Sequence, residues 1–318
     1  MIRIRNLLLW LYSQCFISNF NNKYKLHRKY VLWLIANIGY RTIELLFVIY
    51  LSVYRLLHRY PVPLDTNGKF IVSLTSFPAR INKVWIVIDS LMHQTVRPSR
   101  ICLYLSDDEF PNGRASLPRR LLNYERLGLE ICFRPYNLMP HNKYFYALQE
   151  YSSCDVITVD DDFYYFPNTI ERLARMHEIH PFCVCSNSVN VVEFRPDGLP
   201  LPYNQWLSPI SPVEPSLTNV ALGYSGIYYP AGIFKKQSVF DIDNIRILAL
   251  RTDDLWLRMH ETLERVPVVG GGYRFMGLSI WGTQRIALKH SNCSNKENNG
   301  NDVAWKGLCN HYNVMEYQ

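Results

Sequence analysis

The chain has 318 residues, of which 48% are hydrophobic, 14% aromatic and 19% charged. This apolar content supports one large domain or two ordinary ones, and it excludes an intrinsically disordered chain. The 15 Gly and 18 Pro are too few for a collagen-like or low-complexity protein. The net charge of +7 needs an explanation, because a basic excess is typical of proteins that bind nucleic acids or membranes.

The basic excess lies in residues 1–64, which hold nine Lys and Arg and a single acidic residue, a net charge of +8, whereas residues 65–318 carry −1. The segment is also rich in Leu, Ile, Trp and Tyr, as in helices that lie in a membrane interface. A membrane-spanning helix over Tyr30–Leu57 is disfavoured, because Arg41 and Glu44 fall near its middle. We therefore expect a helical segment at an anionic membrane surface; a helical cap on the main domain or an oligomer interface is the alternative.

The compartment follows from two further observations. Met1–Ile17 has the charged start and apolar run of a signal peptide, but no cleavage site of small residues follows it. The eight cysteines are scattered and include no Cys-x-x-Cys pair, so buried reduced thiols are expected. Both favour a protein at the cytoplasmic face of the cell membrane.

A turn-rich break at 61–68 separates this segment from a pattern of alternating strands and helices. Strands are expected at 70–75, 100–105, 130–133, 155–159 and 182–185, and helices at 81–91, 118–127, 141–151 and 168–179. The alternation predicts an α/β fold with a mostly parallel sheet flanked by helices, whose ligand binds at the carboxyl ends of the strands. Residues 187–232 are irregular and are expected to supply loops to the substrate site.

Three adjacent carboxylates, Asp160, Asp161 and Asp162, directly follow the strand that ends at Val159. Asp160 and Asp162 would point to one face of an extended chain, and hard oxygen ligands of this kind suit Mg²⁺ or Mn²⁺. The alternative is a solvated acidic turn or a helix N-cap. The chain lacks a P-loop, a zinc-protease pattern and a nucleophile elbow, and Tyr164 stands where an aspartyl-phosphate phosphatase would need Thr.

The run Ile71–Arg80, then Ser106-Asp107-Asp108, then the Asp triplet resembles a GT-A-fold glycosyltransferase. The resemblance spans about residues 69–310 and is nearest to bacterial family-two enzymes of surface polysaccharide biosynthesis. It implies a GT-A-like, Rossmann-like domain over 65–318, with the basic helical segment 1–64 outside it.

The resemblance also implies roles for individual residues. The metal, Mn²⁺ or Mg²⁺, would be held by Asp160 and Asp162, with His290 completing its shell. The donor nucleotide sugar would be bound by Thr75, Phe77, Arg80, Asp107, Lys143, Asp160 and Asp161. Other interpretations stay open: a surface arginine for Arg80, a turn-forming Asp107, a solvated first-turn Lys143 and a structural His290.

An inverting transferase also needs a base for the acceptor hydroxyl. Asp253 and Asp254 open a helix and precede Trp256, similar to the acidic-acidic-x-Trp element of these enzymes, so Asp254 is favoured as the base and Trp256 would stack on a sugar. The alternative is helix capping. Residues 298–302 resemble a lid over the donor or a simple loop, and the glycine run 270–272 indicates flexibility and not dinucleotide binding.

The sequence therefore predicts a metal-dependent, inverting glycosyltransferase that moves a sugar, with UDP-sugar the favoured donor, to a hydroxyl of a growing surface glycan. The acceptor would be a glycan or lipid-linked glycan. A sugar-phosphate nucleotidyltransferase is an alternative, although 73–80 lacks the glycine-rich loop of that class. A catalytically inactive membrane-bound scaffold is another. No nucleic-acid partner is expected, because residues 65–318 are close to neutral.

Overall fold

The computed structural model describes residues 5, 7–12, 30–57, 64, 68–273, 277–284, 292 and 300–314. Its strands are β1 (Phe70–Thr75), β2 (Arg100–Ser106), β3 (Leu129–Arg134), β4 (Asp155–Thr158), β5 (Phe163–Tyr165), β6 (Val184–Ser186), β7 (Val189–Val191), β8 (Val213–Ser216), β9 (Asn219–Ala221), β10 (Ile227–Tyr229), β11 (Val268–Gly270) and β12 (Gly277–Ser279). The α-helices are α2 (Tyr30–Leu57), α3 (Val84–Met92), α4 (Arg119–Leu122), α5 (Asn142–Glu150), α6 (Thr169–Ile179), α7 (Ile242–Asn244), α8 (Asp253–Leu263) and α10 (Gly300–Tyr312). The five predicted strands correspond to β1, β2, β3, β4 and β6, and the predicted helices are present with ends shifted by a few residues. Strand β5 was not predicted, and the helix expected at 118–127 is the short α4 followed by a 3₁₀ helix over Asn123–Leu127.

An eight-stranded sheet forms the centre of the molecule, in the order β3-β2-β1-β4-β10-β6-β11-β8. The pairs β3–β2, β2–β1, β1–β4 and β6–β11 are parallel, whereas β10 and β8 pair antiparallel with their neighbours. The predicted α/β class with a mostly parallel sheet is confirmed.

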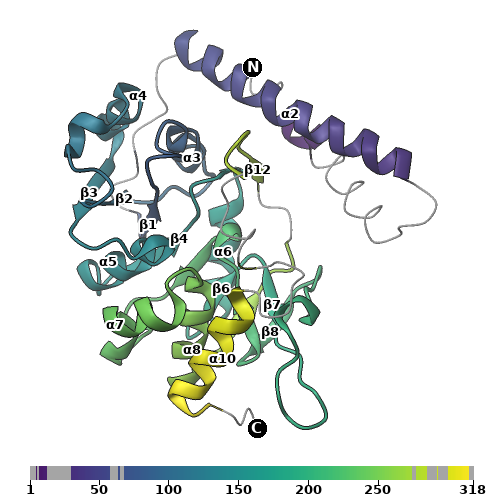
Figure 1. Ribbon diagram of the computed structural model, residues 1–318. Coiled ribbons are helices and arrows are strands. Elements are labelled where there is room, and N and C mark those ends of the chain that lie inside the picture. The colour runs from purple at the N-terminus through teal and green to yellow at the C-terminus, as the bar shows by residue number, and fades with distance from the viewer. Residues whose placement is uncertain are drawn as a thin grey trace.

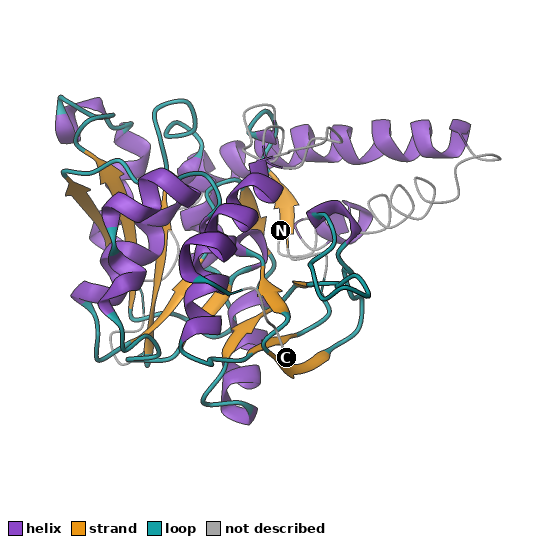
Figure 2. Cartoon of the chain, turned by 60° about the horizontal axis from the view of Figure 1, so that its bottom comes forward, coloured by secondary structure: helices purple, strands orange, loops and turns teal. Residues whose placement is uncertain are grey.

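Helices cover both faces of this sheet (Figure 2). The side chains of β1 alternate between two cores: Phe70, Val72 and Leu74 belong to the core that includes α3 and α6, and Ile71 belongs to the core that includes α5 and α8. A strand buried on both faces reads as a continuous apolar run, which is why β1 could be predicted from the sequence.

The region predicted to be irregular, 187–232, contains the four short strands β7 to β10. Strand β10 lies between β4 and β6 in the main sheet, and β7 pairs with β9 in a small separate sheet. Strands of three or four residues are too short to show a periodic pattern, so the sequence did not predict them.

The glycine run 270–272 is packed against neighbouring chain, which corrects the expectation of flexibility. A Cβ on Gly270 would lie 2.7 Å from the side chain of Val189, and a Cβ on Gly272 would lie 2.1 Å from the backbone of Ser211. Gly272 also has a φ of +70°, which glycine adopts without strain. These glycines therefore allow close approach of two segments.

The N-terminal helix α2 lies along one end of the molecule, beyond β12 (Figure 1). Phe47 from α2 meets Tyr164 of β5 with ring centroids 4.7 Å apart, so the inner face of the helix packs on the body. In the part of the chain that the structure describes, none of the helices has both the length and the hydropathy needed to cross a bilayer.

Candidate active site

The carboxyl ends of β1, β2 and β4 meet at one edge of the main sheet. The three strands are parallel and in register, with Thr75 of β1 beside Tyr104 of β2 and Ser73 beside Thr158 of β4. The residues that follow these strands are therefore brought together although they are far apart in sequence. This is the edge at which α/β sheets bind ligands.

Lys143 joins the Asp triplet to the acidic pair of α8. Its ammonium lies 2.6 Å from Oδ1 of Asp160 and 2.8 Å from Oδ2 of Asp253. Lys143 lies in the first turn of α5, and its carbonyl accepts a hydrogen bond from the hydroxyl of Ser73 in β1. The lysine is only 3% exposed, so the interpretation as a solvated first-turn residue is wrong.

Asp254 completes this group through a backbone contact from a loop. Its Oδ1 accepts a hydrogen bond from the N–H of Gly223, at 3.1 Å, in the short 3₁₀ helix η5 (Gly223–Ser225). A Cβ on Gly223 would lie 2.8 Å from the ammonium of Lys143 and 3.3 Å from Oδ1 of Asp160. Sequence reasoning missed Gly223; the glycine pair at 223 and 226 within the irregular region was the available signal.

Burial and charge give the two acids of α8 opposite character. Burial raises the pKa of Asp254 well above its usual range, and the neighbouring charge of Asp253 raises it further. Burial alone would also raise the pKa of Asp253, but the ammonium of Lys143 outweighs this effect and lowers it. Burial acts to lower the pKa of Lys143, and the carboxylates of Asp160 and Asp253 hold it well above its usual value. Asp253 and Lys143 thus form an ion pair, and Asp254 is a stronger base than an ordinary Asp.

The other two acids of the triplet bind a different cation. The guanidinium of Arg80 pairs with Asp161 and lies 3.2 Å from Oδ2 of Asp162. The hydroxyl of Ser76 donates to Asp161 at 2.6 Å, and the amide of Gln284 donates to Asp162 at 2.9 Å. Arg80 is 8% exposed, so it is not a surface arginine. None of these contacts was predicted: the sequence assigned Arg80 to the donor nucleotide sugar and did not single out Gln284.

The triplet therefore does not present Asp160 and Asp162 to one face, which corrects the sequence-based expectation. Strand β4 ends at Thr158, and the chain turns at Asp161 and Asp162 before β5 begins. The alternation of side chains along an extended strand does not extend through a turn. Asp160 consequently faces α5 and α8, whereas Asp161 and Asp162 face Arg80.

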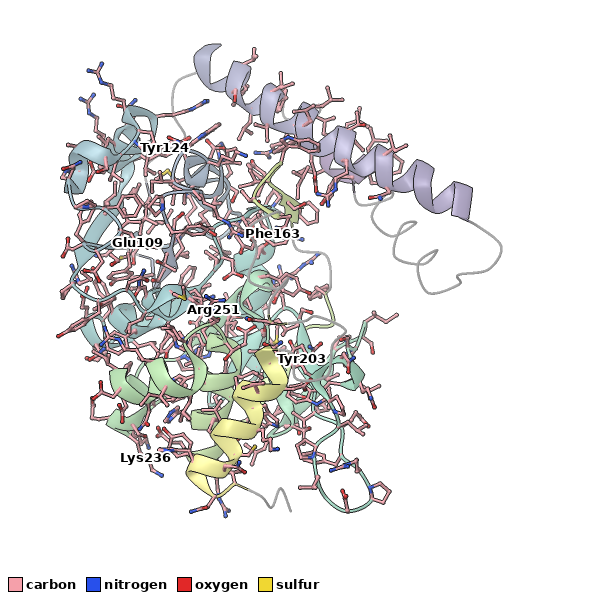
Figure 3. The ribbon with its side chains drawn as sticks, in the orientation of Figure 1. Glu109, Tyr124, Phe163, Tyr203, Lys236 and Arg251 are labelled. Carbon is pink, nitrogen blue, oxygen red and sulfur yellow. The ribbon has the colours of Figure 1, made fainter. Side chains whose placement is uncertain are left out.

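A segment distant in sequence, 277–284, encloses the triplet from the other side. Strand β12 pairs antiparallel with β5, and the N–H of Ile280 donates to the carbonyl of Asp162 at 2.9 Å. The carbonyl of Thr283 accepts from Arg80 at 3.2 Å. In Figure 3, Phe163 of β5 lies at the end of the body nearest α2. The segment 277–284 therefore lies between the triplet and the N-terminal helix.

A buried polar cluster ties the same segment to α2. Glu44 is fully buried and accepts hydrogen bonds from Tyr12, at 3.1 Å, and from the hydroxyl of Ser279 in β12. Its other oxygen pairs with Arg41 at 2.9 Å. Because Ser279 lies one residue before Ile280, the helix and the Asp triplet share one short connecting strand.

The remaining predicted donor residues lie around this edge. The hydroxyl of Thr75 donates to the carbonyl of Tyr104 at 2.9 Å, and the ring of Phe77 lies 5.4 Å from the guanidinium carbon of Arg80. Asp107 is exposed after β2, where its N–H donates to the carbonyl of Arg134. The contacts that the structure gives for Asp107 do not reach the triplet, and its role stays a prediction.

Predicted site residues also lie in the last quarter of the chain, at Trp256, His290 and 298–302. Trp256 is fully buried and donates to the carbonyl of Val239 at 2.9 Å, so it is not available to stack on a sugar. Asp302 accepts from the N–H of Tyr203 within the packed helix α10, which is part of the predicted lid. His290 and residues 298–299 lie outside the described residues.

The described residues do not assemble the predicted metal site. Asp160 is bound by Lys143, and Asp162 by Arg80 and Gln284, so the two expected ligands engage separate partners. Within the described ranges, no group of three or more His, Cys, Asp or Glu side chains is placed to hold a metal. The five carboxylates outnumber the two cations, a charge balance that would favour a divalent cation, but the geometry alone does not provide its ligands.

Comparisons with known proteins give distant likenesses only. No family model matches the chain, and no curated protein matches it. Among solved structures, the chain is similar to residues 1–349 of TarS from S. aureus in complex with UDP, with 16% identity, coverage of 64% of this chain and 60% of that one, and a TM-score of 0.42. It is also similar to the 4-diphosphocytidyl-2C-methyl-D-erythritol synthase of Anaerococcus prevotii DSM 20548, with 12% identity, coverage of 71% and 99%, and a TM-score of 0.42. At these scores we draw no functional conclusion from either likeness.

Proposed function

We propose that this protein is an inverting glycosyltransferase that moves a sugar from a nucleotide-diphosphate donor to a hydroxyl of a growing surface glycan. The observation that carries the proposal is the meeting of Asp160, Asp253 and Asp254 around Lys143 at the carboxyl edge of the sheet. A UDP-sugar is the first donor to test, and a glycan or lipid-linked glycan is the expected acceptor.

In this reaction Asp254 accepts the proton of the acceptor hydroxyl, and Asp160 contacts the donor. Burial raises the pKa of Asp254, which suits a carboxylate that accepts the proton of the acceptor hydroxyl. The acceptor oxygen then bonds to the anomeric carbon while the bond from that carbon to the diphosphate breaks, and its electron pair leaves with the diphosphate. Asp160, with its side chain 32% exposed, is the most accessible acid of the triplet and is placed to contact the donor.

The need for a general base distinguishes glycosyl transfer from the reaction of a sugar-phosphate nucleotidyltransferase. In that reaction the nucleophile is a phosphate oxygen, which is already anionic at neutral pH and needs no base. An acid with a raised pKa next to the triplet is therefore more useful to an enzyme whose nucleophile is a hydroxyl. The raised pKa of Asp254 therefore favours glycosyl transfer over nucleotidyl transfer.

A panel of nucleotide sugars with Mn²⁺ or Mg²⁺ tests the proposal, with donor binding and slow donor hydrolysis as readouts. Asp254→Asn should bind donor normally and lower turnover by about 10²- to 10⁴-fold, the usual contribution of a general base. Asp160→Asn should weaken donor binding by about tenfold or more, as for one charge-assisted contact. The exposed Asp197, whose Asp197→Asn variant should behave as wild type, provides the matched control.

Two outcomes would contradict the proposal. Release of pyrophosphate from a nucleoside triphosphate and a sugar phosphate, with no turnover of nucleotide sugars, would identify a nucleotidyltransferase. Failure to bind any member of the panel would favour an inactive scaffold.

Dependence on Mn²⁺ or Mg²⁺ rests on the resemblance of the Asp triplet and not on a ligand set among the described residues, so it is tested separately. Calorimetric titration of the donor nucleotide, with metal and with EDTA, should show a strong loss of affinity without metal. An Asp162→Ala variant that binds metal and donor as the wild type does would contradict the assignment of Asp162 as a ligand.

A further inference from the structure

The N-terminal helical region exposes many large apolar side chains. Eight of the seventeen exposed large hydrophobic side chains in the described part of the chain lie within its first 57 residues, a concentration that scattered surface exposure does not produce. They are Leu7, Trp10 and Leu11 in the helical stretch 7–12, and Ile38, Leu45, Leu46, Ile49 and Val53 in α2.

The exposed residues of α2 follow helical spacing. Ile38, Leu45, Ile49 and Val53 recur at intervals of seven, four and four residues, so they form one stripe along the helix. Glu44, Phe47 and Leu51 form the opposite stripe and are buried against the body. The helix therefore has two apolar stripes, and among the described residues only the inner stripe is packed against the body.

The charge of the region is of one sign at its surface. Residues 1–64 contain nine Lys and Arg, and their single acidic residue is Glu44. Because Glu44 is fully buried and paired with Arg41, it presents no negative charge to solvent. Every exposed ionised side chain in this segment is consequently positive.

We propose that the outer face of α2 and the stretch 7–12 docks on an anionic lipid bilayer, with the helix lying in the interface. An apolar stripe flanked by Lys and Arg is the composition that inserts at the boundary of headgroups and acyl chains. A second copy of the chain is a poorer occupant, since two segments that each carry a net charge of +8 would repel each other. No described helix is suited to spanning the bilayer.

Docking of the outer face on a bilayer would leave the contacts between the inner face of α2 and the body intact. The buried contact between Glu44 and Ser279, together with the packing of Phe47 on Tyr164, holds the helix against β12 and β5. The helix would therefore bind lipid as a rigid part of the body, and the sheet edge that bears the Asp triplet would be held at a fixed height above the bilayer. Docking itself requires no catalytic activity, so its test stands apart from any assay of turnover.

The test is flotation of the full-length protein with vesicles of phosphatidylcholine, with and without phosphatidylglycerol. The wild type should float with the anionic vesicles, bind the zwitterionic ones weakly and dissociate as salt is raised. The double variant Leu46→Glu, Ile49→Glu should lose at least on the order of tenfold in affinity, because two half-exposed apolar side chains no longer insert. Ile247→Glu, at a 78% exposed position on the main domain, is the matched control and should bind as the wild type does.

Thermal melting checks that the variants remain folded, which exposed positions should permit. Equal flotation of wild type and double variant would overturn the proposal, as would equal binding to both kinds of vesicle at all salt concentrations. A lipid-free dimer that dissociates in the double variant, seen by light scattering, would instead assign the face to self-association. Specific retention by an acidic protein with no vesicle binding would also overturn it.

Discussion

At the scale of single residues, Lys143 is the centre of the candidate site. It is buried and contacts Asp160 and Asp253, two acids that are 93 positions apart in the sequence. A buried ion pair contributes little net stability compared with apolar packing, but removal of one partner leaves the other charge buried without compensation. Lys143 is therefore required as long as Asp160 and Asp253 are retained for function.

We predict that Lys143→Met lowers the free energy of unfolding at pH 7 by about 3–5 kcal/mol, the cost of breaking a buried pair. The deficit should shrink as the pH falls, since protonation of Asp253 removes the charge that the lysine had compensated. Urea unfolding at pH 7 and pH 5 measures both effects. The exposed Lys69 offers the control Lys69→Met, which should change stability by less than about 0.5 kcal/mol. Equal stabilities for the two variants would contradict the structural role of Lys143.

At the scale of elements, strand β12 connects the N-terminal helix with the Asp triplet. Ser279 contacts Glu44 of α2, and the next residue, Ile280, donates its N–H to Asp162. The same segment continues to Thr283 and Gln284, which contact Arg80 and Asp162. A change at the helix should therefore be felt at the triplet.

We predict that Glu44→Leu lowers stability by about 1–3 kcal/mol, because Tyr12 and Ser279 lose a buried acceptor. The loosened segment should also weaken binding of the donor nucleotide, measured by calorimetry, although Glu44 does not contact the triplet. Thr42→Ala, at an exposed position on the same helix, is the control and should affect both measurements much less. Loss of stability with unchanged donor binding would show that the helix and the site are not coupled.

The strands also show which parts of the fold could be predicted from the sequence. Strands β1 and β2 could be predicted because both of their faces are buried, which produces uninterrupted apolar runs. Strand β10, with the sequence Ile-Tyr-Tyr, could not, because three residues carry no period and its place between β4 and β6 depends on pairing with distant strands.

The candidate site likewise contains residues that the sequence could predict and residues that it could not. Asp160 could be found as an acid that follows a buried strand, since the carboxyl edges of parallel strands converge. Asp253 and Asp254 could be found as acids that open a helix before a Trp. The contribution of Gly223 could not be found, because it is a backbone N–H, and backbone donors leave no mark on residue type. Gln284 likewise reaches Asp162 only through the pairing of β12 with β5.

At the scale of the whole molecule, stability should depend on pH through two buried histidines. His141 donates from Nε2 to the carbonyl of Ala249 and accepts at Nδ1 from Tyr144, so its neutral form fits the site. His260 is buried between Ser238 and Tyr312. Burial lowers the pKa of each imidazole to about 4.

The sign of the effect follows from these values. A histidine with a lowered pKa in the folded state contributes its full stability above the unfolded value near 6.5, and this contribution is lost as the pH falls toward about 4. Glu261 acts in the opposite sense: burial raises its pKa to about 7, and Arg258 only partly opposes this, so its contribution is lost as the pH rises through that range. Only a difference between variants therefore isolates the histidines.

We predict that the free energy of unfolding of His260→Gln changes less between pH 6.5 and pH 4 than that of the wild type, by up to about 3 kcal/mol for a shift of this size. The variant itself will be less stable at pH 7, since the ring packs against Trp256 and Tyr312, but its pH profile should be flatter. His311→Gln, at an exposed position in α10, should keep the wild-type slope. Urea unfolding across this pH range measures both profiles. Parallel profiles for the wild type and His260→Gln would contradict the prediction, because they would show that His260 is protonated in the folded protein as readily as in the unfolded chain.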